Sequence, residues 1–268
     1  MTNPFATTHP ARFAQRALLL TSFTLAVLAG CKPPDEKIDP TRPRPPSTSR
    51  HLEAGRSVKG RPIDAWILGD GTDVTLILAT IHGDEPAGTP LVKRLADHLA
   101  ANPHLLDGRR VVIVPVANPD GMAANTRTNS RGVDLNRNYP ATNYKHNGTH
   151  GDKALSEPES VALHALIEKH RPARIVSLHQ PLRWGKACID YDGPGKALAE
   201  AMAAACDLPL VKIGARPGSL GSYAGETLGT PIITVELPRD TTHWPEAKLW
   251  ERYGKMMLTA LVSYTAIP

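Results

Sequence analysis

The strongest constraint on the fold is a regular alternation of short apolar runs with longer amphipathic segments. The apolar runs have the length and the Val and Ile content of buried strands, and they lie at residues 63–68, 74–80, 111–116, 174–178 and 232–237. Helices are expected at residues 86–101, 157–169, 196–205 and 247–264. Strands that alternate with helices predict an α/β fold, with a mixed, mostly parallel sheet that carries helices on both faces.

Local signals predict how some of these segments are joined. Gly-Asp-Gly at residues 69–71 predicts a hairpin-type turn between the first two strands. Asn-Pro-Asp-Gly at residues 118–121 predicts a turn after the third strand. Ser156 is the expected N-cap of the second helix, with Glu159 three residues later as in a capping box. Residues 122–153 are polar and lack periodicity, and a loop of that length inside a compact domain is usually functional.

The N-terminus has the pattern of a secretory signal. Arg12 and Arg16 precede an apolar run at residues 17–29. This run is shorter than the roughly 20 residues of a transmembrane helix. It ends in Leu-Ala-Gly-Cys at residues 28–31, which resembles a bacterial lipobox, in which Cys31 is acylated and becomes the mature N-terminus. An ordinary cysteine after an ordinary signal is the alternative.

The residues after Cys31 predict a tether. Residues 32–50 contain six prolines and no large apolar cluster, so this segment is expected to stay extended. We therefore expect a signal peptide at residues 1–30, an acylated cysteine and tether at residues 31–50, and one folded domain at residues 51–268. Such a lipoprotein would face the periplasm of the bacterial envelope. Lys32, by resemblance to known lipoproteins, favours the outer membrane.

The charge distribution argues against a nucleic-acid partner. The chain has a formal net charge of +5, but its first 50 residues hold seven Lys and Arg against three Asp and Glu. The remaining residues hold 24 basic against 23 acidic side chains, without the basic excess of a nucleic-acid-binding domain. Beyond Cys31, the chain has only Cys188 and Cys206, which could form a disulfide or remain as two free thiols.

Three side chains are candidate metal ligands. His82 and Glu85 follow an apolar strand directly, three residues apart, and His179 follows another such strand. Imidazole and carboxylate groups are zinc ligands, and two histidines with one glutamate leave a position open for water, as in catalytic sites. Alternatively, the histidines end their strands without a ligand, and Glu85 only complements a helix N-terminus.

Further charged residues could complete a hydrolytic site. Glu236 lies within an apolar strand, where burial would raise its pKa toward the range of a general acid or base. The polar loop supplies Arg127, a candidate for oxyanion stabilisation, and Asn136 with Arg137, which could hold a substrate carboxylate. Each of these side chains could instead be solvated. Further candidates for the pocket wall follow His179, namely Arg183, Trp184 and Lys186.

These motifs occur in the order found in the zinc carboxypeptidases of the carboxypeptidase A type, which the chain resembles over residues 51–268. They are His82 and Glu85, residues 118–121, residues 134–140 (Asp-Leu-Asn-Arg-Asn-Tyr-Pro), His179 and Glu236. The resemblance implies one Zn²⁺ ion bound by His82, Glu85 and His179. It also implies carboxylate binding by Asn136 and Arg137, an oxyanion role for Arg127 and catalysis by Glu236.

Within this family the chain is most similar to the murein peptide amidases. The similarity lies at residues 156–159, 176–182, 208–211 and 217–223. It implies hydrolysis of the bond between γ-D-glutamate and meso-diaminopimelate in peptides from peptidoglycan. The mobile active-site tyrosine of the pancreatic-type enzymes has no clear match before Gly218, and Tyr223 is the candidate for a substrate-binding tyrosine.

Other functions compatible with these motifs are a general metallocarboxypeptidase, a deacylase, and a non-catalytic lipoprotein that binds wall peptides. The intact set of His82, Glu85, His179 and Glu236 favours an enzyme. The sequence does not define the oligomeric state or which of these substrates is used.

Overall fold

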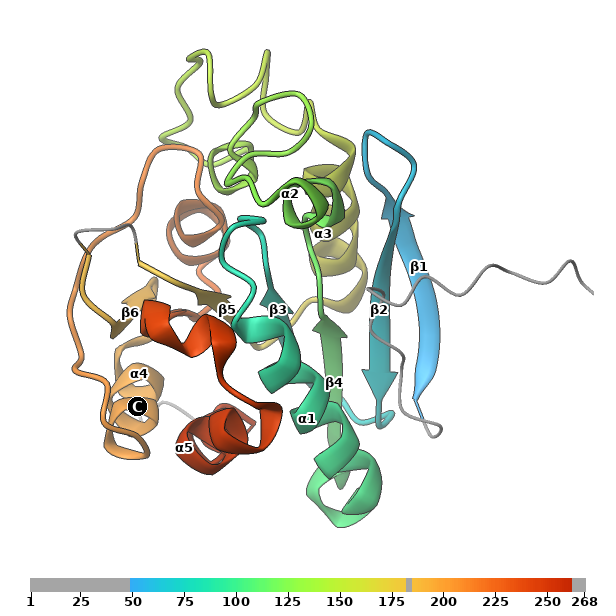
Figure 1. The fold of residues 1–268 in the computed structure, drawn as a ribbon, viewed down its shortest axis with the longest axis vertical. Helices are drawn as coiled ribbons and strands as arrows, with labels where there is room; N and C mark the ends of the chain where they lie inside the picture. Colours follow the sequence, from blue (N-terminus) through green and yellow to red (C-terminus); the bar gives the residue numbers. More distant parts are fainter. Residues whose placement is uncertain (1–48, 182–184, 262–268) are drawn as a thin grey trace, which may run out of the picture. The chain divides into compact units, whose positions relative to one another are not determined.

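The computed structural model describes residues 49–181 and 185–261, which form a seven-stranded mixed sheet with helices on both faces (Figure 1). The strands are β1 (Arg50–Arg56), β2 (Pro62–Leu68), β3 (Asp73–Ala79), β4 (Arg109–Val114), β5 (Arg174–His179), β6 (Cys188–Asp192) and β7 (Ile232–Glu236). Their spatial order is β1-β2-β4-β3-β5-β7-β6, and β2 and β6 run opposite to the other strands. The predicted fold class is therefore confirmed.

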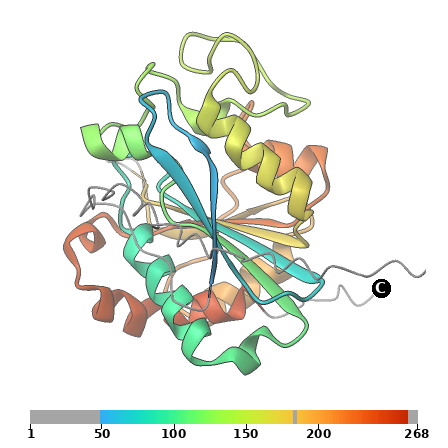
Figure 2. The same cartoon turned by 90° about the vertical axis from the view of Figure 1, so that its right-hand side faces the viewer.

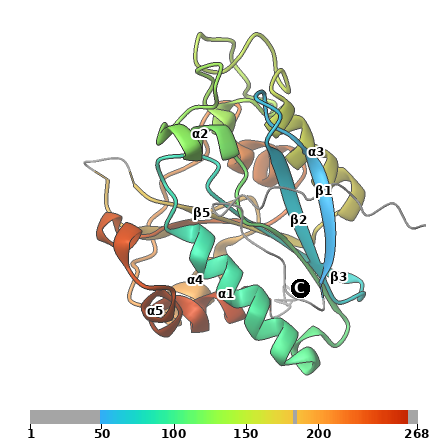
Figure 3. The same ribbon diagram turned by 45° about the vertical axis from the view of Figure 1, so that its right-hand side comes forward.

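Helices form a layer on each side of the sheet. The α-helices are α1 (Gly88–Ala101), α2 (Pro119–Ala124), α3 (Pro158–His170), α4 (Lys196–Ala204) and α5 (Glu246–Thr259). Shorter helical turns are η1 (Pro103–Leu106), η2 (Leu135–Arg137), η3 (Ser222–Thr227) and η4 (Arg239–His243). Figures 2 and 3 show α1 and α5 on one side of the sheet and α3 on the other. No helix among the described residues is long and apolar enough to cross a membrane.

Each layer encloses its own apolar core. Along β3, alternate side chains enter opposite cores, because Ile77 packs with α1, α4 and α5 while Leu76 and Leu78 pack with α3 and η3. Every residue of β3 after the first is buried, as expected for a central strand covered on both faces. On the outside, α1 is anchored by a buried row at Leu91, Leu95 and Leu99.

The predicted hairpin between the first two strands is wrong. Strand β4 lies between β2 and β3, pairing antiparallel with β2 and parallel with β3. The turn at residues 69–71 crosses the start of β4 instead, where Gly71 N donates to Arg109 O. A Cβ on residue 69 would lie 2.3 Å from the same carbonyl oxygen, so glycine at this position lets the turn pass close to β4. The glycine does not mark a two-residue hairpin.

Other local expectations need correction. Residues 118–121 do not form an isolated turn but begin helix α2. The side chain of Asn118 accepts a hydrogen bond from Gly121 N and caps this helix. The N-cap of α3 is Glu157 and not Ser156, whose hydroxyl bonds Glu157 and Asn138 instead. Glu159 accepts from Val58 N near β1, so it joins two elements and forms no capping box.

Strands β1 and β6 and the turn η3 were not expected from the sequence. Cys188 in β6 is buried, Cys206 is half-buried, and both are free thiols, which decides between the two alternatives left open. The predicted signal peptide, Cys31, most of the tether, Arg183 and Trp184 lie outside the described residues.

Candidate active site

The candidate site forms where three neighbouring parallel strands end. His82 and Glu85 follow β3, while His179 and Glu236 are the last residues of β5 and β7. These strands are adjacent in the order β3-β5-β7, so their carboxyl ends meet at one edge of the sheet. Ligand sites of open α/β sheets form at this edge.

A sharp connection between β3 and α1 presents the first two side chains. Thr80 has a φ of 56°, which is strained for a β-branched residue, and its buried hydroxyl lies 2.8 Å from that of Thr89. Its carbonyl oxygen accepts from Asn118 N. A Cβ on Gly83 would lie 1.9 Å from the carbonyl carbon of Gly121, so only glycine fits there. The segment predicted as a simple turn therefore supports the loop that carries His82.

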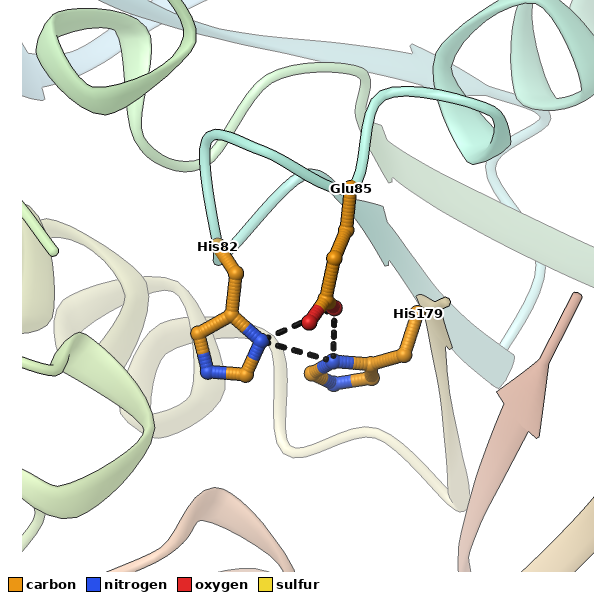
Figure 4. Close-up of side chains that lie close together, drawn as sticks. All are labelled: His82, Glu85 and His179. Atoms are coloured by element: carbon orange, nitrogen blue, oxygen red, sulfur yellow. Dashed lines mark hydrogen bonds and ion pairs between the residues drawn. The ribbon is translucent and has the colours of Figure 1, made fainter. Parts of the chain in front are cut away.

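His82, Glu85 and His179 converge on one point, as Figure 4 shows. Glu85 Oε2 lies 2.9 Å from His82 Nδ1 and 3.0 Å from His179 Nδ1, and the two Nδ1 atoms are 3.2 Å apart. All three side chains are buried. Two imidazole nitrogens and one carboxylate form a donor set that fits zinc and leaves a fourth position open. The predicted metal ligands are thus brought together.

A second layer of side chains orients the two imidazoles. Asp134 Oδ1 lies 3.1 Å from His82 Nε2, and Ser177 Oγ lies 2.9 Å from His179 Nε2. A hydrogen bond at Nε2 favours the tautomer whose Nδ1 lone pair faces the position that a metal ion would occupy. No role was predicted for either residue from the sequence. The only signal for Ser177 is its spacing of two residues from His179, which places both side chains on one face of β5.

Two carboxyl groups of the site are held in their ionised form. Burial disfavours ionisation of Glu85, but His82 and His179 outweigh it and hold the pKa of this carboxyl well below its usual range. The same balance holds for Asp134, whose pKa is lowered by His82 and Arg127 against the effect of burial. Arg127 pairs with Glu85 Oε1 and with Asp134, while the other oxygen of Glu85 lies between the two imidazole nitrogens. An ionised carboxylate oxygen beside two imidazole nitrogens is a donor set that favours a bound metal cation.

Glu236 occupies the neighbouring position on β7. Its Oε2 is buried and has no hydrogen-bond partner among the described residues. Burial raises the pKa of Glu236, and the negative charge of Glu85 adds to this shift. A desolvated, unpaired carboxylate oxygen is costly for a fold, and such groups are common where a proton is transferred.

A cavity of about 300 Å³ lies over these residues and is also lined by the predicted Arg127, Asn136 and Arg137. Arg127 donates through Nη1 to Glu85 and through Nε to Asp134, at 2.9 and 3.1 Å. Asn136 Oδ1 accepts from Leu220 N at 2.9 Å. Its Nδ2 has no hydrogen bond to any described residue, so it can donate to a ligand. Lys186 also lines the cavity.

The expectation for Tyr223 is wrong. Its ring is 3% exposed and stacks on Tyr139 within the core beneath α3, with 6.0 Å between ring centroids. Its hydroxyl donates to Glu168 at 2.9 Å, on α3. No tyrosine is among the described residues that line the cavity. The turn η3 therefore directs the ring of Tyr223 into the core and not toward the cavity.

Comparisons with known proteins agree with this geometry. Residues 36–183 match the zinc carboxypeptidase family. Murein peptide amidase A of Escherichia coli K12 is 38% identical over 224 residues, which cover 74% of this chain and 86% of the relative. The corresponding enzyme of Vibrio campbellii is 35% identical, with 69% and 77% covered.

Solved structures show the same fold. The crystal structure of murein-tripeptide amidase from Escherichia coli O157 matches with a TM-score of 0.60 and 31% identity, covering 80% of this chain and 96% of that one. Carboxypeptidase A from Helicoverpa armigera matches with a TM-score of 0.64 at 21% identity, covering 80% and 69%.

Proposed function

The chain belongs to the zinc carboxypeptidase family and is a hydrolytic enzyme, and we propose that it releases the C-terminal residue of murein peptides. The bond cut would be the amide between γ-D-glutamate and meso-diaminopimelate. The observation that carries this proposal is the 38% identity to a murein peptide amidase across 86% of that relative, combined with an intact ligand set.

His82, Glu85 and His179 would hold the single zinc ion of this family. Lewis-acid activation of the attacking water and of the scissile carbonyl is the chemistry that zinc supplies at such a site. Asp134 and Ser177 keep the two imidazoles oriented for this purpose.

Glu236 would act as the general base and then as the general acid. Its carboxylate takes a proton from the attacking water, and the same proton then passes to the amine that leaves when the C–N bond breaks. The raised pKa of Glu236 makes its carboxylate a stronger base than an ordinary one, and a pKa closer to the working pH lets the same group accept a proton and then release it. Arg127, at the cavity wall beside Glu85, would stabilise the negative charge that develops on the carbonyl oxygen.

Asn136 and Arg137 would hold the terminal carboxylate of the substrate. The free Nδ2 of Asn136 and the half-buried guanidinium of Arg137 both line the cavity. Binding this carboxylate restricts hydrolysis to the last bond of the peptide, which is the property of a carboxypeptidase.

The proposal is tested with the purified full chain loaded with zinc. We would incubate it with L-Ala-γ-D-Glu-meso-diaminopimelate, with and without a chelator, and detect free diaminopimelate by mass spectrometry. Chelator-sensitive release is the expected result. Release only from α-linked peptides would indicate a general carboxypeptidase, release of acyl groups a deacylase, and zinc binding without any turnover a peptide-binding lipoprotein.

We also propose that the enzyme is a lipoprotein anchored in the bacterial envelope with its domain facing the periplasm. The lipobox-like residues 28–31 and the proline-rich segment that follows support this. Buried acyl chains add about 0.8 kcal/mol of membrane affinity per methylene group. The chain should fractionate with membranes and become soluble in a Cys31→Ser variant. A variant that still pellets with membranes would contradict the anchor.

A further inference from the structure

We infer that Asp190, Asp192 and Arg216 recognise the side chain of the residue that is released, and that this side chain ends in both an ammonium group and a carboxylate. All three residues line the same cavity as Glu236. The inference rests on the proposed function, because it names the chemical group that the proposed active site would select.

The pairing of β6 with β7 places the two aspartates beside the catalytic position. In the antiparallel register Cys188 pairs with Glu236, Asp190 with Thr234, and Asp192 with Ile232. Since side chains two apart in a strand share one face, both aspartates lie on the face that carries Glu236. Each step of two residues advances by about 7 Å, so the carboxylates form a row that leads away from the reaction centre.

The aspartates carry more negative charge than the described residues neutralise. Both are only 4% exposed. The cation within 4 Å of them is Lys212, whose Nζ lies 2.6 Å from Asp192 Oδ1 and 4.0 Å from Asp190 Oδ1. Two buried carboxylates thus share one ammonium group that is itself half-exposed. A buried charge without a partner is costly, so a second cation from a substrate would complete this cluster.

Both carboxylates are held in fixed positions. Asp190 Oδ1 accepts from Ile213 N at 3.0 Å. A Cβ on Gly221 would lie 2.2 Å from Asp192 Oδ2, so the glycine leaves the space that this carboxylate fills. Positions that are fixed before binding lower the entropic cost of recognising a ligand.

Arg216 supplies the opposite charge at the same cavity. It is exposed and forms no ion pair with any described residue, whereas Arg127 is already paired with Glu85 and Asp134. Its backbone is held, because Arg216 O accepts from Ser222 Oγ at 2.8 Å. A guanidinium free to form a bidentate pair matches a carboxylate. A lysine side chain would satisfy the aspartates alone, and an apolar side chain would satisfy neither charge.

Four substrates that differ only in the last residue separate these contributions. They are L-Ala-γ-D-Glu peptides that end in meso-diaminopimelate, in lysine (no distal carboxylate), in 2-aminopimelate (no distal amine) or in norleucine (neither group). Each missing charged group should lower kcat/KM by about 10- to 100-fold. Equal kcat/KM on all four would overturn the inference while leaving the proposed function intact. No hydrolysis of any of them would instead reject the proposed function.

Two variants assign each charge to its residue. Asp192→Asn should reduce the preference for diaminopimelate over 2-aminopimelate, because only Asp190 remains, but keep the preference over lysine. Arg216→Gln should give the reverse result. Asp207→Asn is the matched control, because Asp207 pairs with Arg252 on the surface, outside the cavity.

Zinc content and thermal unfolding would be measured for every variant. A variant that fails to fold would leave the decision to the four wild-type values. A folded Asp192→Asn variant that keeps the full wild-type preference would contradict the assigned role.

Discussion

His179 and Glu236 are paired directly across β5 and β7, the only contact in that ladder that joins two ionisable side chains among the described residues. Because paired residues of parallel strands point to the same face, a metal ligand and a carboxylate lie side by side at the sheet edge. Glu85 reaches the same point from β3, where its Oε2 meets His179 Nδ1. The proposed zinc ligand His179 and the proposed base Glu236 are therefore different side chains that lie next to each other.

This separation predicts that the two functions can be dissociated at Glu236. Glu236→Gln keeps the shape of the side chain but removes the base, so kcat should fall by about 10²- to 10⁴-fold. Zinc content, measured by elemental analysis, should stay at the wild-type level. Glu226→Gln, at an exposed site in η3, is the control and should have wild-type activity. Full turnover in a folded Glu236→Gln variant would exclude the proposed base.

Asp134 predicts a complementary phenotype. Its Oδ1 bonds His82 Nε2, and its Oδ2 accepts from Arg127. In Asp134→Asn one oxygen is replaced by a donor, so the imidazole loses orientation and basicity. Zinc affinity should fall by about 10- to 100-fold, as for other outer-shell carboxylates. A competition titration with a fluorescent chelator measures this.

The control for that variant is Asp97→Asn in α1, whose carboxylate pairs with Lys93 and with no other residue that the structure describes. It should bind zinc as the wild type does. Equal affinity in the Asp134 and Asp97 variants would show that His82 is oriented by the backbone alone.

The sequence allowed the central strands to be predicted because β3, β5 and β7 are mostly buried and are rich in apolar residues. It did not predict the spatial order of the strands. The position of β4 between β2 and β3 depends on pairing between distant segments, which no local pattern records. Strand β1 was missed because its residues are largely exposed and its apolar content is low.

The same limit applies to the site. His82, Glu85 and His179 could be predicted because each follows a recognisable strand, and the order of motifs matched a known family. Tyr223 was misplaced because its sequence does not reveal whether η3 turns it toward the cavity or the core. Asp190 and Asp192 lie in an unpredicted strand, although their alternation with apolar neighbours is a signal of one charged face.

The loop that presents His82 predicts a strict requirement for glycine at position 83. In Gly83→Ala the new methyl group would meet the backbone of Gly121 at 1.9 Å, so the loop or α2 must move. We expect a loss of about 1–3 kcal/mol in the free energy of unfolding, together with weaker zinc binding. Chemical denaturation measures the first effect. Gly148→Ala, where no atom lies within 4 Å of the added carbon, should be neutral in both respects.

Tyr223 gives the prediction that separates this structure most clearly from an active-site tyrosine. In Tyr223→Phe the ring stays stacked on Tyr139, and only the hydrogen bond to Glu168 is lost. Because the carboxylate of Glu168 remains partly solvated, the stability should fall by no more than about 1 kcal/mol. No group that lines the cavity changes, so kcat and KM for the tripeptide should both stay within about twofold of wild type, well short of the 10²-fold effect of losing a catalytic proton donor. Steady-state kinetics and thermal unfolding on the same preparation test both parts. A large fall in kcat without a change in stability would place the hydroxyl at the reaction centre and contradict the position assigned to η3.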